Sequence, residues 1–414
     1  MGIGIILLTL VLLCAAGWPL RAALQRLHVP PAVSLMALGV VVGPPLLDLL
    51  PKEWLEAGSL LSKAAFVVLL IRAGLGLSND ALKAIAVPAL LLGTIPVAAE
   101  LLAVFGLARG VLFDRADVAI LAAFLIAAVS PAVILPTMLT QKDLGRSAAR
   151  FVPDRIMGQT VVNAFIAQTG ILLLVDAVCP ASSGDGWEDQ LAFVPLALLG
   201  GLAIGIVGGL GYRADAILGS RDLQPSAGKV RLFCIALIGG GLAAYFGCAQ
   251  LGMESVFATL ALGVMMRRRV DWCEPLLRGE LAHFWRVAEI VLFANLGSQI
   301  ELAKLADLGL VFLLLGIILA ALAVRITIGF LLVQRTPLTT GERRYTAIAH
   351  LPKATIQAVF GAYPLKIFIE RGDDPALREV GNTLLVMAVL AIVVTAPLGA
   401  VLLDRLGARY LEGD

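Results

Sequence analysis

Long apolar runs follow one another along the whole chain, and short polar connections separate them. Most runs hold roughly 18 to 25 residues, which is the length that a helix needs to cross a hydrocarbon core about 30 Å thick. The alternating segments typical of a transmembrane β-barrel are not seen. In lipid only helices and closed barrels satisfy every backbone group, so the pattern predicts an all-α polytopic membrane protein.

The apolar runs predict about thirteen transmembrane helices. The predicted ranges are 2–20, 32–50, 60–77, 85–108, 117–140, 153–176, 191–212, 230–249, 253–266, 284–300, 309–333, 345–365 and 382–407. The connections are short, so none of them has room for a nucleotide-binding, DNA-binding or catalytic domain. We therefore expect a single transmembrane unit over residues 1–414.

The composition supports this class. The chain is 59% hydrophobic and 15% charged, whereas a soluble domain carries about 25% charged residues. A net charge of +2 without a basic tail gives no reason to expect nucleic-acid binding. The five cysteines show no CxxC spacing and the three histidines are scattered, so we expect no cofactor and no bound metal beyond a transported cation.

Basic residues fall mainly in alternate connections. With the N-terminus outside, about 21 basic residues lie on the cytoplasmic side and about 8 on the other, as the positive-inside rule requires. This asymmetry supports an odd number of spans with the C-terminus inside, and it fits a bacterial inner membrane. No Lys or Arg precedes the first apolar run, so we interpret that run as a span and not as a signal peptide.

Three charged residues lie deep inside predicted spans, namely Glu100, Arg325 and Lys353. Charges at this depth are costly, and they usually face a partner or a cavity. We expect Glu100 and Arg325 to form a buried ion pair. Lys353 follows Pro352 within a span, so we expect it at a helix break.

Two predicted spans carry internal prolines. The segment AAVSPAVILPTM contains Pro131 and Pro136, and HLPKATIQ contains Pro352. Proline removes a backbone donor and interrupts a helix, and paired interrupted helices indicate the binding site of a transporter. The polar residues Thr137, Asn163, Thr355 and Gln357 lie near these breaks, although groups of this kind also join neighbouring helices.

The two interrupted spans are seven spans apart, and so are the spans of Glu100 and Arg325. Because seven is odd, the two halves run in opposite directions, which predicts an inverted repeat whose broken helices cross at mid-membrane. We expect a core domain within 85–176 and 309–407, and a dimerisation domain within 1–77 and 191–300.

Three collinear segments resemble the monovalent cation:proton antiporter superfamily, and its NHA-type sodium/proton antiporter branch most closely. They are LLIRAGLGLSNDALK (69–83), AAVSPAVILPTML (127–139) and LPKATIQA (351–358). The resemblance implies a thirteen-helix inverted repeat, a homodimer, and a core domain that moves like an elevator. By the same resemblance, Glu100 and Arg325 correspond to a buried pair, Lys353 to the lysine of the LPK motif, and Ser130 and Pro131 to the helix crossover.

The chain departs from the family pattern at the ion-binding position. The family carries Asp-Asp or Asn-Asp in its sixth helix, and without gaps this pair falls on Asn163 and Ala164. The carboxylate that would bind a cation and exchange protons is therefore an alanine. If Arg325 neutralises Glu100, Lys353 leaves a net positive charge at mid-membrane.

Three functions stay open on the sequence. The first is sodium or lithium/proton antiport through a displaced carboxylate such as Glu100. The second is the same fold carrying an anion or a neutral solute. The third is a transport-dead homologue with a sensing or interaction role. We do not expect an enzyme, because no Ser/His or paired Asp constellation lies within the spans, and no filter-like segment indicates a channel.

Overall fold

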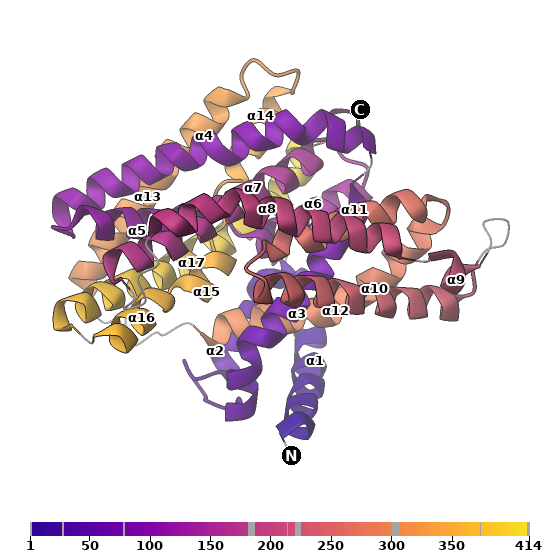
Figure 1. Cartoon of the computed structure of the whole chain (residues 1–414), viewed down its shortest axis with the longest axis horizontal. Helices are drawn as coiled ribbons and strands as arrows, with labels where there is room; N and C mark the ends of the chain where they lie inside the picture. Colours follow the sequence, from indigo (N-terminus) through magenta and orange to yellow (C-terminus); the bar gives the residue numbers. More distant parts are fainter. Residues whose placement is uncertain are drawn as a thin grey trace. The chain divides into compact units, whose positions relative to one another are not determined.

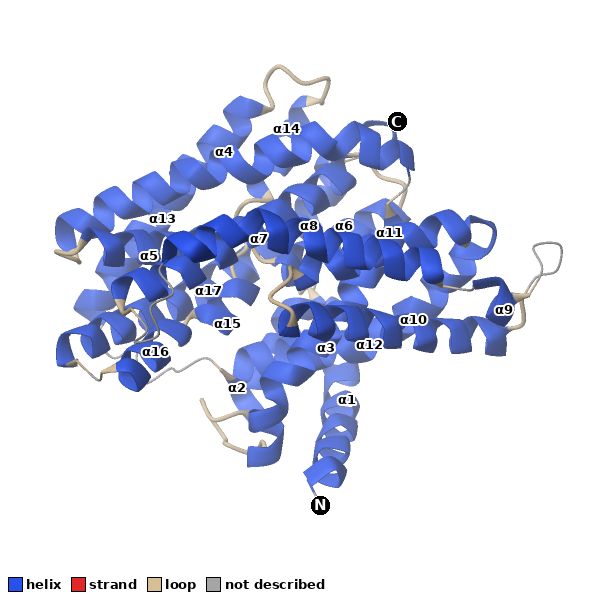
Figure 2. Cartoon of the chain, viewed as in Figure 1, coloured by secondary structure: helices blue, strands red, loops and turns tan. Residues whose placement is uncertain are grey.

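The computed structural model describes residues 2–26, 29–77, 79–180, 187–212, 214–219, 225–299, 307–372 and 374–411. These residues form helices and connecting loops without strands, as Figure 2 shows. The α-helices follow in chain order, coloured from indigo to yellow in Figure 1. They are α1 Gly2–Arg26, α2 Pro31–Val42, α3 Lys52–Gly76, α4 Asn79–Val111, α5 Ala116–Ala127, α6 Pro131–Asp143, α7 Val152–Val178, α8 Trp187–Gly211, α9 Ala214–Leu218, α10 Ala227–Gln250, α11 Ser255–Arg269, α12 Glu274–Ser298, α13 Leu308–Leu332, α14 Thr340–Ile348, α15 Thr355–Phe360, α16 Tyr363–Arg371 and α17 Pro375–Tyr410. Two 3₁₀ turns, η1 Ala148–Arg150 and η2 Asp271–Cys273, complete the described elements.

The helical class of membrane protein is confirmed. Eight helical segments of the described chain are long and apolar enough to cross a membrane, or nine if the bent pair Lys52–Gly58 and Leu60–Gly76 counts as one span. Each of the thirteen predicted ranges contains helix within the described residues. The count of thirteen spans stays a prediction, because several of these helices are shorter or more polar than a full span.

One predicted range is wrong at its end. The range 32–50 was expected to be a single helix, but α2 ends at Val42 and residues 43–50 form turns. Two consecutive prolines, Pro44 and Pro45, follow the helix and cannot continue its hydrogen bonding. The apolar run continues past the point where the helix stops, so hydropathy alone overestimates the length of α2.

The chain divides into two compact units. Unit 1 comprises 1–17, 51–83 and 192–295, and unit 2 comprises 18–50, 84–191 and 296–414. The identification of these units with a core and a dimerisation domain stays a prediction.

Unit 1 contains a close helix–helix contact between α3 and α11. A Cβ atom on Gly74 would lie 2.5 Å from the Leu260 carbonyl oxygen and 2.9 Å from the Gly263 Cα atom. Only glycine permits backbones to approach so closely, as is common where helices pack in membranes. Beside this contact, Val67 and Ile71 of α3 join Phe233 in an apolar cluster.

Unit 2 is built around the two interrupted helices. Figure 1 shows α15, α16 and α17 in yellow near α5, and α5 and α7 pack against one another. Buried residues of α5, α7, α13 and α17 form one apolar cluster that includes Ala164. Small side chains are frequent in this cluster, which lets the helices approach closely around the breaks.

Candidate functional site: two crossing helix breaks around a buried carboxylate

The first helix break separates α5 from α6. Helix α5 ends at Ala127, residues 128–130 are extended, and α6 begins at Pro131. Proline suits the first position of a helix because the donor that it lacks would have no intrahelical partner there. Pro136 was expected to contribute to the interruption, but it lies inside the continuous helix α6.

The second break separates α14 from α15. Helix α14 ends at Ile348, residues 351–354 are not helical, and α15 begins at Thr355. Pro352 lies within this break, as predicted. Lys353 also lies within it, fully buried, so it does not extend to a membrane surface.

The two breaks contact one another directly. The Ser130 backbone N–H donates to the Pro352 carbonyl oxygen at 2.8 Å. The Ser130 and Thr355 hydroxyl oxygens lie 2.9 Å apart, and the Thr355 backbone N–H donates to Ser130 Oγ at 3.3 Å. These bonds satisfy backbone groups that a helix would otherwise pair internally, so each break stabilises the other.

Asn163 of α7 caps the first break. Its Oδ1 accepts from the Val129 backbone N–H at 2.6 Å, and its Nδ2 donates to the Ala127 carbonyl oxygen at 3.3 Å. Both ends of the amide therefore bond to the interrupted backbone. Sequence reasoning placed Asn163 near the breaks as a candidate ligand, and the structure shows it as a backbone cap.

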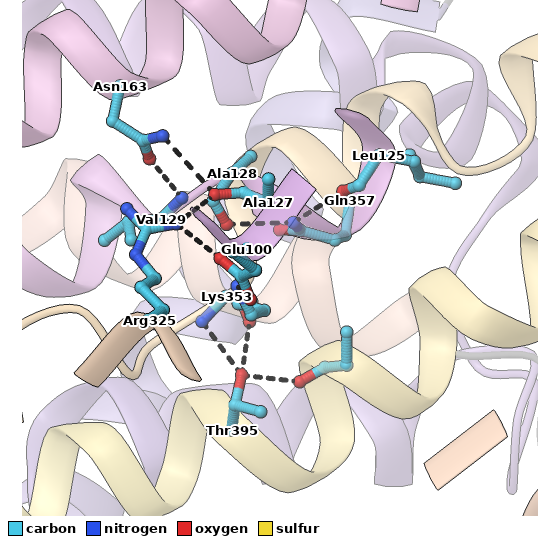
Figure 3. Close-up of polar contacts among 11 residues, drawn as sticks. Glu100, Leu125, Ala127, Ala128, Val129, Asn163, Arg325, Lys353, Gln357 and Thr395 are labelled. Carbon is cyan, nitrogen blue, oxygen red and sulfur yellow. Dashed lines mark hydrogen bonds and ion pairs between the residues drawn. The ribbon is translucent and has the colours of Figure 1, made fainter. Parts of the chain in front are cut away.

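Gln357 of α15 caps the same helix end. Its Nε2 donates to the Leu125 carbonyl oxygen at 2.9 Å and to the Ala128 carbonyl oxygen at 3.0 Å. The last carbonyls of a helix lack intrahelical donors and carry its negative dipole end. Asn163 and Gln357 together satisfy several of these carbonyls (Figure 3).

A fully buried carboxylate lies between two cations beside this helix end. Glu100 Oε2 lies 2.5 Å from Arg325 Nη1, and Glu100 Oε1 lies 2.7 Å from Lys353 Nζ. Among the charged side chains that the structure describes, these three have 0% exposed surface. We call Glu100, Arg325 and Lys353 the charged trio; Figure 3 shows Glu100 between the other two.

The charged trio is joined to the helix breaks. Arg325 Nη1 also donates to the Ala127 carbonyl oxygen, the same oxygen that Asn163 contacts. The Lys353 backbone N–H donates to Thr395 Oγ1 of α17 at 2.9 Å. Motion at either break would therefore change the surroundings of Glu100.

The approach of α17 to the second break depends on a glycine. A Cβ atom on Gly399 would lie 2.5 Å from Pro352 Cγ. Thr395 lies one turn before Gly399 and donates to the Ala391 carbonyl oxygen at 2.7 Å, so its hydroxyl is fixed when it accepts from Lys353. Thr395 was not among the predicted site residues; its signal in the sequence is a hydroxyl in the middle of an apolar span.

Two predicted ligands lie in other surroundings. Ala164 is 5% exposed and belongs to the apolar cluster of unit 2. The Thr137 hydroxyl donates to the Val133 carbonyl oxygen within its own helix, at 2.9 Å. The predicted contact between Glu100 and Arg325 is present, and Lys353 shares the same carboxylate, a contact that the sequence did not predict. With one carboxylate between two cations, the net positive charge expected at this position remains.

This arrangement defines a class of protein. A fully buried carboxylate that is paired with two charged side chains, beside two interrupted helices in contact, is typical of helical membrane transporters in which ions bind at broken helices. The described residues contain no group of three or more His, Cys, Asp or Glu that could hold a metal ion.

The comparisons with known proteins identify the family. The family model described as "Sodium/hydrogen exchanger, transmembrane" matches residues 8–406. The chain therefore belongs to the sodium/hydrogen exchanger family, whose members are transporters and not enzymes.

The chain is similar to two sodium/hydrogen exchangers of animals. Sodium/hydrogen exchanger 9B1 of Macaca fascicularis is 27% identical over 357 residues, which cover 86% of this chain and 67% of that protein. Sodium/hydrogen exchanger 9B2 of Homo sapiens is 28% identical over 361 residues, which cover 86% of this chain and 64% of that protein. The chain spans about two thirds of the length of these relatives. The resemblance to the antiporter superfamily and an integral membrane location are thus confirmed, whereas a bacterial membrane and the orientation of the termini stay predictions.

The fold matches a solved antiporter. The structure of the sodium proton antiporter MjNhaP1 from Methanocaldococcus jannaschii at pH 8 aligns with a TM-score of 0.73 and 17% sequence identity, over 100% of both chains. At this identity the match shows the fold alone.

Proposed function

We propose that the chain is a monovalent cation:proton antiporter, with sodium or lithium as the cation, and that Glu100 is the carboxylate that binds it. The observation that supports this most strongly is the position of Glu100. It is fully buried beside the crossing of two broken helices, and its two oxygens are paired with the side chains of Arg325 and Lys353. The names of the relatives and of the structural neighbour support the same activity.

Glu100 offers the oxygen ligands that a small cation needs. Glu100 Oε2 and the Ala127 carbonyl oxygen both contact Arg325 Nη1, so these two oxygens point toward one position. Carboxylate and carbonyl oxygens are the groups that bind hard cations. A cation that reaches Glu100 would complete its shell with such carbonyls or with water.

Exchange with protons follows from the charges. Lys353 occupies one oxygen of Glu100, so an arriving cation competes with the ammonium group for that oxygen. Two positive charges beside one carboxylate repel one another strongly in a medium of low dielectric constant. Binding of the cation is therefore accompanied by loss of one proton from the coupled Glu100–Lys353 pair, and rebinding of a proton expels the cation.

The transport cycle is proposed to be of the elevator type. The interrupted helices and the charged trio belong to unit 2. In this proposal the domain that carries them alternates between the two sides of the membrane, while unit 1 supplies the dimerisation domain of a homodimer. Both parts of this proposal rest on the resemblance to the antiporter superfamily.

The test compares two buried glutamates. Purified protein in liposomes with an acidic interior and a pH-sensitive dye would be exposed to Na⁺, Li⁺ or K⁺. The native chain and Glu342→Gln, which makes the same chemical change at a buried carboxylate outside the charged trio, should both exchange Na⁺ or Li⁺ for protons. Glu100→Gln should fall to the background of empty liposomes.

Two results would contradict the proposal. Exchange that persists in Glu100→Gln would place the cation elsewhere. Absence of flux for all three cations in the native chain would favour a transport-dead protein or a different substrate.

A further inference from the structure

The charged trio carries one positive charge more than negative. Its single carboxylate is shared by Arg325 and Lys353, and all three side chains have 0% exposed surface. A buried charge without compensation is costly at mid-membrane. At the family's carboxylate position the chain has Ala164, so this position supplies no second negative charge.

Arg325 has an unused binding edge. Its Nη1 contacts both Glu100 and the Ala127 carbonyl, but its Nε and Nη2 have no hydrogen-bond partner among the described residues. Nε and Nη2 together form the side-on edge of a guanidinium group, whose parallel N–H bonds bind one anion at two points. This edge belongs to a fully buried side chain.

A histidine lies beside the same face of α13. His350 is 1% exposed, and its Nε2 also lacks a partner in the described part of the chain. A Cβ atom on Gly329 would lie 2.8 Å from His350 Cδ2 and 2.9 Å from His350 Nε2, so the ring lies directly on Gly329. Gly329 follows Arg325 by four residues, which places both on one helix face about 6 Å apart along the axis. A neutral imidazole can donate a hydrogen bond from Nε2.

We infer that Arg325 and His350 form a binding site for a small monovalent anion such as chloride, on the side of Arg325 away from Glu100. The guanidinium edge supplies two donors and the imidazole a third. The anion neutralises the excess charge of the trio, so Glu100 stays available to a cation. This anion site is separate from the cation site of the proposed function, and its existence does not depend on cation transport.

The absence of a side chain at residue 329 matters to this site. An alanine there would push against the imidazole at a distance that real Cβ contacts essentially never show. The ring would have to shift, which displaces Nε2 from its present position against α13. Gly329→Ala therefore weakens the site without changing any charge.

The experiment measures anion binding and not transport. The thermal unfolding midpoint of purified protein in detergent would be followed by tryptophan fluorescence. The N-methyl-D-glucamine salts of chloride and of gluconate, an anion too large for the site, would be compared at equal ionic strength and pH. Chloride should raise the midpoint of the native chain in a saturable manner, and radioactive chloride should bind at about one ion per chain.

Variants separate the site from general salt effects. Arg325→Lys keeps the charge but removes the two-donor edge, so the chloride-dependent shift should be lost. Gly329→Ala should shift half-saturation to higher chloride concentration. Arg109→Lys, in which the original guanidinium contacts the Phe113 carbonyl, should respond like the native chain.

The inference would be overturned by equal midpoints in the two salts, or by a chloride response that is unchanged in Gly329→Ala. If Arg325→Lys does not fold, the Gly329→Ala titration and the binding stoichiometry decide. A positive result together with absent cation flux would refute the proposed function and leave the anion site in place.

Discussion

Two buried glutamates of unit 2 are held in very different ways. Glu342, in the first turn of α14, accepts from Arg150 Nε with both oxygens at 2.8 Å, from the Ser147 hydroxyl, and from the Thr339 backbone N–H at 2.7 Å. Glu100 is held only by two charged side chains, and no backbone donor contacts it in the described structure.

Under the proposed function, this difference separates a carboxylate that stabilises the fold from one that binds the cation. Backbone and hydroxyl donors cannot leave Glu342 without unfolding the capping box at the start of α14. The partners of Glu100 are the ends of two long side chains, Arg325 and Lys353, and not backbone groups. Burial is common to both glutamates, so the proposal that Glu100 binds the cation rests on the kind of partner that each carboxylate has.

The largest expected effect on stability follows removal of the Glu100 charge. Glu100→Gln leaves Arg325 and Lys353 buried without a countercharge, which should cost about 3–5 kcal/mol of unfolding free energy. Denaturation of the purified variant beside the native chain would measure the loss. A variant as stable as the native protein would show that Glu100 does not hold the two cations together.

A second test adds a carboxylate instead of removing one, at residue 164 of α7. Ala164→Asp adds a negative charge next to Asn163, which already contacts the helix break. If the site is competent for cations, the concentration of Na⁺ that gives half-maximal exchange should fall on the order of tenfold, equivalent to about 1.4 kcal/mol. An unchanged value would mean that residue 164 does not reach the transported ion.

Removal of the Glu342 charge should lower stability less than removal of the Glu100 charge, and its effect should be purely structural. Glu342→Gln loses charge-assisted hydrogen bonds worth about 1.5–3 kcal/mol. The unfolding midpoint should fall, while the dependence of cation exchange on pH should match that of the native chain. A shifted pH profile in the liposome assay would give Glu342 a role in transport and remove the contrast with Glu100.

The same glutamate predicts a dependence of stability on pH. Burial by itself would raise the pKa of Glu342, but hydrogen bonds from Arg150, Ser147 and Thr339 outweigh it and lower the pKa below the ordinary 4.5. The stabilisation is therefore fully present above pH 4.5 and is lost as the pH falls through the lowered pKa. The difference in unfolding midpoint between the native chain and Glu342→Gln should shrink only below about pH 4.5. A difference that already declines near about pH 6 would contradict this origin.

The smallest effect is expected at Thr395. Thr395→Val keeps the shape of the side chain but leaves the Lys353 backbone N–H without its acceptor, at a cost of about 1 kcal/mol. We expect slightly lower stability and slower exchange, measured in the same two assays. The matched control is Thr383→Val on an exposed part of the same helix, since the Thr383 hydroxyl bonds only to the Glu379 carbonyl in the described contacts.

Two kinds of feature of this site could be predicted from the sequence. They are the charged side chains, whose burial in lipid costs free energy, and the proline that interrupts a helix. Charged side chains such as Glu100 and Arg325 are costly in lipid, and the predicted repeat places them in corresponding spans, so their contact could be predicted. Pro352 interrupts its helix because proline lacks a backbone N–H donor, and this property is visible in the sequence itself.

The remaining features depend on the three-dimensional crossing. Whether Lys353 meets Glu100, and whether Asn163 binds an ion or caps a backbone, is decided by how the breaks pack against α7 and α4. No spacing rule contains this information. The early end of α2 was not predicted for another reason. The residues after Pro44 and Pro45 are apolar, so the hydropathy pattern extends the predicted helix to residue 50, although the two prolines prevent helical hydrogen bonding there.

Proton release upon cation binding is the most direct test of whether the cation and the proton compete at Glu100. Na⁺ or Li⁺ would be added to weakly buffered, detergent-solubilised protein that contains a pH indicator. If Glu100 binds the cation, the native chain and Glu342→Gln should release protons in a saturable manner, and Glu100→Gln should release none. Equal release from Glu100→Gln would show that the cation and the proton compete at another group.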